Sequence, residues 1–480
     1  MGGHKADNSA PLKDLASLLE PSSLVLVGTA AAVVSLAAHR ALHHERECRM
    51  QRFRGGGGDH ATITIDGRQA LFVPMAASCS LLCIFYFFSS VAQIMTAFAA
   101  YASGTSLVFT LDPVAQYLDE LLLQKGAGPW VVSLWGRRVR RDTATLAALA
   151  ATVVLTWLIS GHWLLNNALG VFLCIAFVSH IRLPNIKVCT LLLGALYIYD
   201  AFWVFYSERW FGSNVMVAVA SKRVANPMRV AAKSLHLPVP RAVATRLDLP
   251  VKLLFPAHLF APGGLGGGAE GEYVMLGLGD VAAPGMLVAL ALMLDKRRDL
   301  KGKAEDVEDQ GGAGGKSHQT AFSLMFWSFS PIKSLFSPQG PQGPRLPTTV
   351  GAMPGTLRSS PEDLLGAGGY YPRSGSASWR GAAACARELV AASGRGYLGW
   401  ALGGYVFGLV VALSAGLLSH EPQPALFYIV PCSLLPVVAA GWRRGELREL
   451  WDGPAPHPPA AGAEGGGARG HAALSHDHGM

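Results

Sequence analysis

The chain has 480 residues, of which 51% are hydrophobic and 15% are charged, with a mean hydropathy of +0.31. About a quarter of the residues of an ordinary soluble domain are charged, so this composition excludes that class. The hydrophobic residues fall in blocks of about 20, the length of a helix that crosses the hydrocarbon layer. We therefore predict an all-α polytopic membrane protein, and we attribute the net charge of +8 to topology signals beside the spans rather than to nucleic-acid binding.

Nine apolar blocks are predicted to span the membrane as helices, after a polar lumenal N-terminal segment of residues 1–21. Seven blocks lie within residues 22–294 and two lie within residues 397–441. The nine predicted spans are 22–39, 70–90, 92–111, 144–160, 163–180, 188–206, 274–294, 397–418 and 423–441. Residues 295–396 and the tail 442–480 are rich in small residues and proline without sustained periodicity, and we predict both to be disordered cytosolic segments.

Arginine and lysine mark one side of the membrane. They gather in the short segments after spans one, three, five, seven and nine, whereas the alternate short segments carry almost none. The basic segments are 40–54, 137–141, the pair Arg182 and Lys187, 296–303 and 443–448. Because positively charged segments stay in the cytosol, the N-terminus is predicted to be lumenal or extracellular and the C-terminus cytosolic.

Two acidic residues lie inside otherwise apolar spans. Asp280 stands near the start of "MLGLGDVAAPGMLVALALML", residues 275–294, and Asp200 lies within "GALYIYDAFWVFYS" on the preceding span. A charge at membrane depth costs about 2.5–3.5 kcal/mol or more, so such residues are usually functional and paired. No basic residue lies near either aspartate inside its span. We therefore expect the two carboxylates to face each other across the interface between spans six and seven.

Two carboxylates within hydrogen-bonding reach favour one shared proton, because both cannot ionise cheaply. The pair then supplies a base that activates water and an acid that polarises a peptide carbonyl, as in aspartic proteases. Carboxylates at mid-membrane also form proton or cation pathways in transporters. A scaffold that binds single transmembrane helices is a third alternative. Composition and position leave these alternatives open.

Short motifs accompany the two aspartates. Gly277 and Gly279 bracket Leu278 immediately before Asp280. Glycines at these positions allow close backbone approach and a loosened helix start, so that an extended substrate could reach the aspartate; simple helix packing is the alternative explanation. Pro424 stands at the start of span nine, where a proline is also ordinary at a helix N-terminus.

Together these motifs resemble those of a known family. Tyr199 with Asp200, "GLGD" at 277–280 and "QPAL" at 423–426 look like the YD, GxGD and QPAL motifs of the signal peptide peptidase family of intramembrane aspartyl proteases. They occur in the family's order, on the sixth, seventh and ninth spans of a nine-span chain. Three motifs in this register are far more specific than a single GxGD would be.

The resemblance extends beyond the motifs and implies a fold. Residues 155–207 and 212–222 are similar to the branch of signal peptide peptidase-like proteases that lacks a large lumenal domain. The similarity covers most of residues 70–295 and 397–441. It implies a nine-helix fold of the presenilin and signal peptide peptidase kind. The predicted orientation is that of this family and is opposite to that of the related presenilins.

Carried over to this sequence, the resemblance implies functions for the motif residues. Asp200 and Asp280 would be the catalytic dyad, and Gly277 and Gly279 would shape the active site. The Pro-Ala-Leu residues of span nine would lie beside the dyad and support its geometry or substrate docking. The remaining motif residues are Tyr199, Leu278, Gln423, Pro424, Ala425 and Leu426.

The resemblance also implies partners and a location. Substrates would be transmembrane segments of type II membrane proteins or signal-peptide remnants, hydrolysed by water that the two aspartates activate. We predict no cofactor, no metal and no nucleic-acid partner; the partners are the lipid bilayer and the substrate helix, and a homo-oligomer is left open. The protein would be a multi-pass protein of the endomembrane system, in the Golgi, the endoplasmic reticulum or the endosome.

Overall fold

The structure, a computed structural model, describes residues 20–53, 62–122, 131–134, 137–236, 238, 243–257, 273–311, 396–419 and 423–453. Within these residues, nine helices are long and apolar enough to cross a membrane, which confirms the predicted number of spans. Residues 1–19, 312–395 and 454–480 include most of the segments predicted to be polar or disordered, and they lie outside the described residues.

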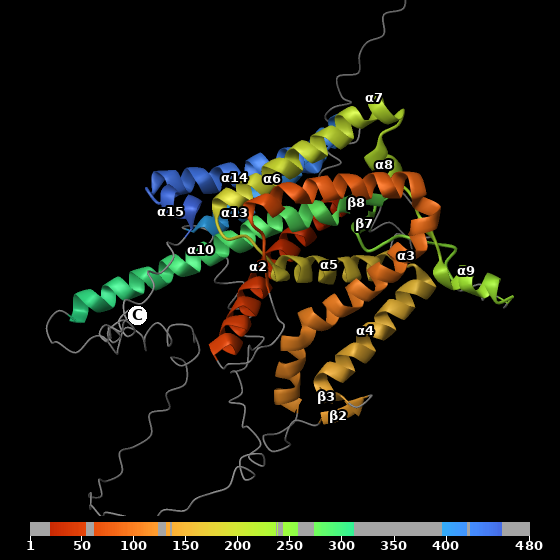
Figure 1. Cartoon of the computed structure of the whole chain (residues 1–480), viewed down its shortest axis with the longest axis horizontal. Coiled ribbons are helices and arrows are strands. Elements are labelled where there is room, and N and C mark those ends of the chain that lie inside the picture. The colour runs from red at the N-terminus through yellow and green to blue at the C-terminus, as the bar shows by residue number, and fades with distance from the viewer. Residues whose placement is uncertain are drawn as a thin grey trace, which may run out of the picture.

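The spans pack side by side in one bundle, which Figure 1 shows from one side. Helix α3 contains two spans, Gly67–Phe88 and Ser90–Gln116, because it kinks at Phe87 (φ −112°, ψ 25°). The spanning helices are α2 (Pro21–Phe53), α3 (Gly67–Leu122), α4 (Arg141–Ser160), α5 (Trp163–His180), α6 (Ile186–Ala201), α10 (Leu278–Gly311), α13 (Tyr397–Ser419) and α14 (Ala425–Arg443).

The seventh span begins later than the sequence predicts. Strand β8 (Tyr273–Gly277) pairs antiparallel with β7 (Lys252–Pro256), and α10 starts only at Leu278. The prediction of a span that begins at residue 274 is therefore wrong. Hydropathy does not distinguish a short apolar strand from the first turn of a helix, and the partner strand comes from a segment about 20 residues earlier.

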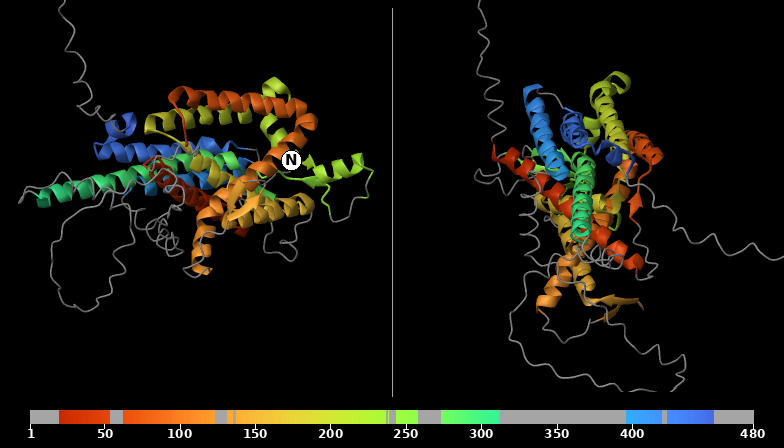
Figure 2. Two further views of the ribbon diagram at one scale, coloured as in Figure 1. Left: turned by 60° about the horizontal axis from the view of Figure 1, so that its bottom comes forward. Right: turned by 90° about the vertical axis from the view of Figure 1, so that its left-hand side faces the viewer.

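Two helices extend into segments that the sequence predicts to be disordered. Helix α10 continues past its span to Gly311 and projects from the bundle, as Figure 2 shows, and α15 (Leu447–Asp452) follows α14. The prediction of disorder is wrong for these residues. The segment "DKRRDLKGKAEDVED", 295–309, consists largely of good helix formers, so a helix that leaves the membrane continues through it.

The long connection between α6 and α10 folds back onto the bundle. Helix α6 continues into a π-helical turn, η2 (Phe202–Tyr206), and small elements then lead the chain to β7. These elements are α7 (Ser207–Phe211), α8 (Val215–Ala220), β5 (Val224–Ala225), α9 (Pro227–Ser234) and β6 (Arg246–Leu247). The remaining strand pairs are β1 (Ile63–Thr64) with β4 (Ile181–Arg182), and β2 (Val131–Leu134) with β3 (Arg137–Arg140).

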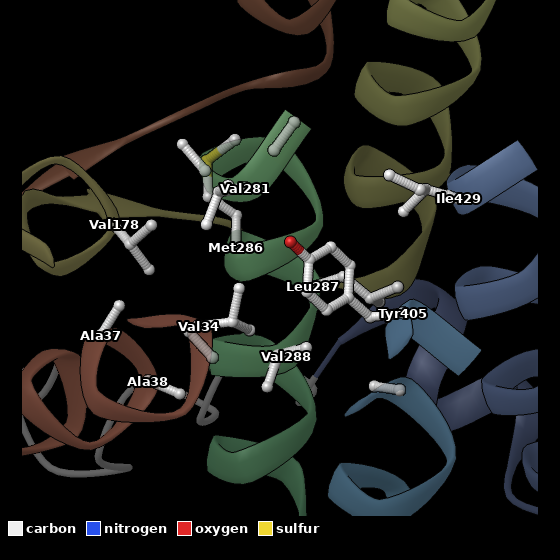
Figure 3. Packing of buried hydrophobic residues seen from close by; sticks show 14 of the residues in the cluster. Val34, Ala37, Ala38, Val178, Val281, Met286, Leu287, Val288, Tyr405 and Ile429 are labelled. Carbon is white, nitrogen blue, oxygen red and sulfur yellow. The ribbon is translucent and has the colours of Figure 1, made fainter. Parts of the chain in front are cut away.

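Helix α10 lies at the centre of the packed core. Of the nine spans it has the largest share of buried residues, and α2, α5, α13 and α14 pack against it. Lipid tails are as apolar as these side chains, so close van der Waals packing holds the spans together and fixes the start of α10. Figure 3 shows this packing with Val34, Ala37 and Ala38 from α2, Val178 from α5, Val281, Met286, Leu287 and Val288 from α10, Tyr405 from α13 and Ile429 from α14.

Helices α13 and α14 approach each other at backbone distance. A Cβ atom on Gly404 would collide with the carbonyl oxygen of Cys432, and one on Gly408 would lie 2.8 Å from the Cα of Ile429. Glycines spaced four residues apart in this way allow two spans to touch along their backbones. The contact holds α14 in place, with its first turn against α6.

Candidate active site

Asp200 lies in the last turn of α6 and is 1% exposed. Its Oδ2 accepts a hydrogen bond from the backbone N–H of Leu426, with an N···O distance of 3.0 Å. Leu426 lies in the first turn of α14, whose N-cap residue, Pro424, has no side chain that can accept a hydrogen bond. Asp200 therefore caps α14 from a neighbouring helix, and the positive end of the α14 dipole faces its carboxylate.

Asp280 lies in the first turn of α10, and its side chain folds back over Gly277. A Cβ atom on Gly277 would lie 3.0 Å from the Oδ2 of Asp280, which is closer than carbon and oxygen normally pack. A Cβ atom on Gly279 would meet no atom within 4 Å. Pro284 stands four residues after Asp280 and has no N–H, so the Asp280 carbonyl lacks its usual helical partner. The helix start around Asp280 is thus open on one side and loosely bonded.

Asp200 and Asp280 lie on helices that contact each other, α6 and α10, which brings the two carboxyl groups into one site. Tyr199 directly precedes Asp200, and its ring centroid lies 6.5 Å from that of Trp203. In the described part of the chain, neither aspartate forms an ion pair with a lysine or arginine. Like charges in one site favour a single shared proton, because a second ionisation would have to overcome the repulsion of the first.

The other motif residues have distinct positions. Gln423 donates to the Oγ of Ser419 (3.0 Å) and accepts from the hydroxyl of Tyr428 (3.1 Å), so its side chain links the end of α13 to α14. Ala425 is the first residue of α14 and is half-buried. The backbone N–H of Leu278 donates to the carbonyl of Val251 at 2.9 Å and so links α10 to the segment that leads into β7.

Sequence reasoning missed Tyr405 on α13. Its side chain is completely buried, and Figure 3 shows its hydroxyl directed towards α10. Among the described residues that hydroxyl has no hydrogen-bond partner. A tyrosine in the middle of an apolar span, within "GGYVFG" at 403–408, is the signal that the sequence offers for this residue.

The π-helical turn immediately after Asp200 was also missed. The indole Nε1 of Trp203 donates to the Oγ of Ser78 at 3.1 Å, and the Nδ2 of Asn214 donates to the carbonyl of Val204 at 2.9 Å. Wide turns of this kind are often found at functional sites. These bonds hold the wide turn and so fix the end of α6 that carries Asp200.

Comparison with known proteins decides which family this arrangement represents. Residues 58–457 match the family model described as signal peptide peptidase. The chain belongs to the signal peptide peptidase family. Members of this family are intramembrane aspartic proteases, and this chain is therefore a membrane-embedded protease whose substrates are membrane helices. The membership decides against the transporter and scaffold alternatives.

Individual relatives agree with the family assignment. The chain is 40% identical over 444 residues to signal peptide peptidase-like 1 of Oryza sativa subsp. japonica, which covers 92% of this chain and 95% of that protein. Identity to signal peptide peptidase-like 1 of Arabidopsis thaliana is 40% over 438 residues, 91% of this chain and 94% of that protein. Identity to signal peptide peptidase of Homo sapiens is 28% over 258 residues, 50% of this chain and 59% of that protein. No solved structure matches the chain significantly.

Proposed function

We propose that this protease hydrolyses peptide bonds within the transmembrane segments of type II membrane proteins or signal-peptide remnants, with Asp200 and Asp280 as its catalytic dyad. The observation that carries the proposal is the pairing of the two carboxylates. Asp200 lies in the last turn of α6 and Asp280 in the first turn of α10; these helices contact each other, and neither carboxylate has a basic partner among the described residues. This is the arrangement that a shared catalytic proton needs.

The hydrogen bond from Leu426 supports different roles for the two aspartates of the proposed dyad. A carboxylate that accepts an N–H at a helix N-terminus is favoured in its ionised form, so Asp200 is the base and Asp280 carries the shared proton. Asp200 takes a proton from water as the water oxygen attacks the carbonyl carbon, and Asp280 donates its proton to the carbonyl oxygen. The diol then collapses: Asp200 protonates the amide nitrogen as the C–N bond breaks, and one hydroxyl proton returns to Asp280.

The orientation that we propose has a lumenal N-terminus and a cytosolic C-terminus, in an endomembrane such as the Golgi, the endoplasmic reticulum or the endosome. Ion pairs that join separate basic segments support one cytosolic face. Arg182 lies 3.4 Å from Glu45, and Arg298 lies 3.5 Å from Glu446. The segments after spans one and five therefore meet, as do those after spans seven and nine, as the positive-inside rule requires.

The test is the cleavage of a single-span type II reporter by the purified, detergent-solubilised chain. Asp200→Asn and Asp280→Asn should each abolish cleavage, while the variants still fold and show a cooperative thermal unfolding transition. Asp295→Asn is the matched control and should keep cleavage. Asp295 is a half-buried carboxylate on α10, the helix that also carries Asp280, and its two oxygens accept the N–H groups of Tyr397 and Leu398 (both 2.8 Å). Cleavage by either dyad variant would reject the dyad. Cleavage of a type I reporter in place of the type II reporter would reject the proposed substrate orientation.

A further inference from the structure

Side chains of α5 hold the outer edge of strand β7. Asn167 donates from its Nδ2 to the carbonyl of Leu254 (2.7 Å), and its Oδ1 accepts the N–H of the same residue (2.8 Å). Asn166 donates to the carbonyl of Lys252 at 3.0 Å. Both asparagines are buried, with exposed fractions of 6% and 1% for Asn167 and Asn166. Asn167 thus makes with β7 the pair of bonds that a neighbouring strand would make.

The strand that Asn167 holds is connected directly to the start of α10. Val251 precedes β7, and its carbonyl accepts the N–H of Leu278, two residues before Asp280. Gly170 lies one turn after Asn167 on the same face of α5. A Cβ atom on Gly170 would lie 3.3 Å from the carbonyl oxygen of Pro250 and 3.4 Å from the Cδ1 of Leu278. This face of α5 is therefore the surface on which the segment before Asp280 rests.

We propose that Asn167 is a positioning residue for Asp280. Its amide fixes the position of β7 along α5 and, through the β7–β8 strand pair and Leu278, fixes the distance between the carboxylates of Asp280 and Asp200. An amide suits this role, because it is uncharged and carries its donor and its acceptor on two separate atoms, so that one side chain can pair with both the C=O and the N–H of Leu254. The inference rests on the proposed function, since it concerns the geometry of the same dyad.

The test measures kcat, KM and thermal unfolding of the purified full chain with a type II reporter. Asn167→Leu keeps the branched shape of the side chain and removes both hydrogen bonds to β7. We expect kcat to fall about tenfold to a hundredfold, because a displacement of about 1 Å between reacting groups has effects of this size. KM should change by less than about twofold, because the reporter's remaining contacts are kept. Asn167→Gln carries the same groups on a longer chain and should retain more of the activity than Asn167→Leu.

Leu169→Ala is the matched control. Leu169 lies on the same helix, is fully buried and packs on a separate cluster with Leu107, Ala150 and Trp157 of α3 and α4. This substitution should lower the unfolding temperature through the cavity that it leaves, with kcat maintained. A wild-type kcat for Asn167→Leu would overturn the proposal. The proposal would also be overturned if kcat fell in both Leu169→Ala and Asn167→Leu, in proportion to the decrease in unfolding temperature of each variant.

Gly170→Ala provides a second route if Asn167→Leu does not fold. It removes no hydrogen bond and presses on Leu278 and on the segment before β7, so kcat should again fall with KM maintained. A wild-type kcat in this variant would contradict the proposal. Failure of the proposed function would give a different result from failure of this inference. Cleavage by Asp280→Asn would reject the dyad, and this outcome does not depend on the kcat of the Asn167 variants.

Discussion

The carboxyl group of Asp280 rests against a glycine that has no room for a side chain. Gly277→Ala would bring a methyl group to 3.0 Å from the Oδ2 of Asp280, whereas Gly279→Ala would place one in open space. We expect Gly277→Ala to lower kcat at least about tenfold, since the carboxylate must move away, and Gly279→Ala to stay within about threefold of the wild type. Reporter cleavage by the two purified variants checks this, and equal losses in both would contradict the steric explanation.

Tyr405 presents a buried hydroxyl that no described residue satisfies. Replacing such a hydroxyl with hydrogen removes an unpaired polar group, so Tyr405→Phe should unfold at the wild-type temperature or slightly above it. We expect kcat to fall about tenfold in the same variant, because the hydroxyl points towards α10, the helix that carries Asp280, and can bond to water or substrate there. Measurements of the unfolding temperature and of the cleavage rate of the same variant test whether stability is kept while activity falls. A lower unfolding temperature with an unchanged rate would make Tyr405 a structural residue only.

At the scale of elements, the contact between α13 and α14 depends on two glycines. Gly404→Ala would force the backbones apart at Cys432 and should destabilise the protein by about 1–3 kcal/mol. Cleavage should fall as well, because α14 carries the Leu426 N–H that binds Asp200. Gly403→Ala is the matched control: its Cβ meets nothing within 4 Å, and alanine favours the helix by up to about 1 kcal/mol. Thermal unfolding in detergent distinguishes the two variants, and equal unfolding temperatures would contradict the packing argument.

The spans could be predicted from sequence, because an apolar run of about 20 residues has few alternatives to a membrane helix. Strand β8 could not, since "YVMLG" is as apolar as the helix that follows it, and its pairing depends on β7. The two aspartates stand in consecutive apolar spans without a basic residue nearby, and this pattern predicted that their carboxylates face each other. The hydrogen bond between Leu426 and Asp200 could not be predicted, because every residue except proline has a backbone N–H and the residue type does not indicate which one is the donor.

The asparagines of α5 illustrate a similar limit of the sequence. Asn166 and Asn167 stand in an apolar span, where the pattern indicates hydrogen bonds to another helix. The structure places those bonds on the backbone of β7, a strand that the sequence did not indicate. A polar residue in a span therefore predicts that a partner exists, and only the fold identifies the partner.

At the scale of the whole molecule, α10 and α13 are joined independently of the chain that connects them. The carboxylate of Asp295 accepts the N–H groups of Tyr397 and Leu398 at 2.8 Å, which fixes the start of α13 beside α10. We therefore expect that replacing residues 312–395 with about 20 Gly and Ser residues preserves cleavage within about twofold. Such a linker has an average reach of about 25 Å, close to the length of the α10 extension. Reporter cleavage and thermal unfolding check the expectation, and lost cleavage with normal unfolding would assign the segment a regulatory role.

The cap that Asp200 provides for α14 has a consequence for the design of inhibitors. One oxygen of Asp200, Oδ2, is already engaged by the enzyme's own backbone at Leu426. A compound that donated to Oδ2 would have to share that oxygen with the Leu426 N–H and fit against the first turn of the ninth span, whereas one directed at Oδ1 and at Asp280 would avoid that turn. Compounds with a single central hydroxyl should therefore be better starting points than bulkier groups that enclose both oxygens of Asp200.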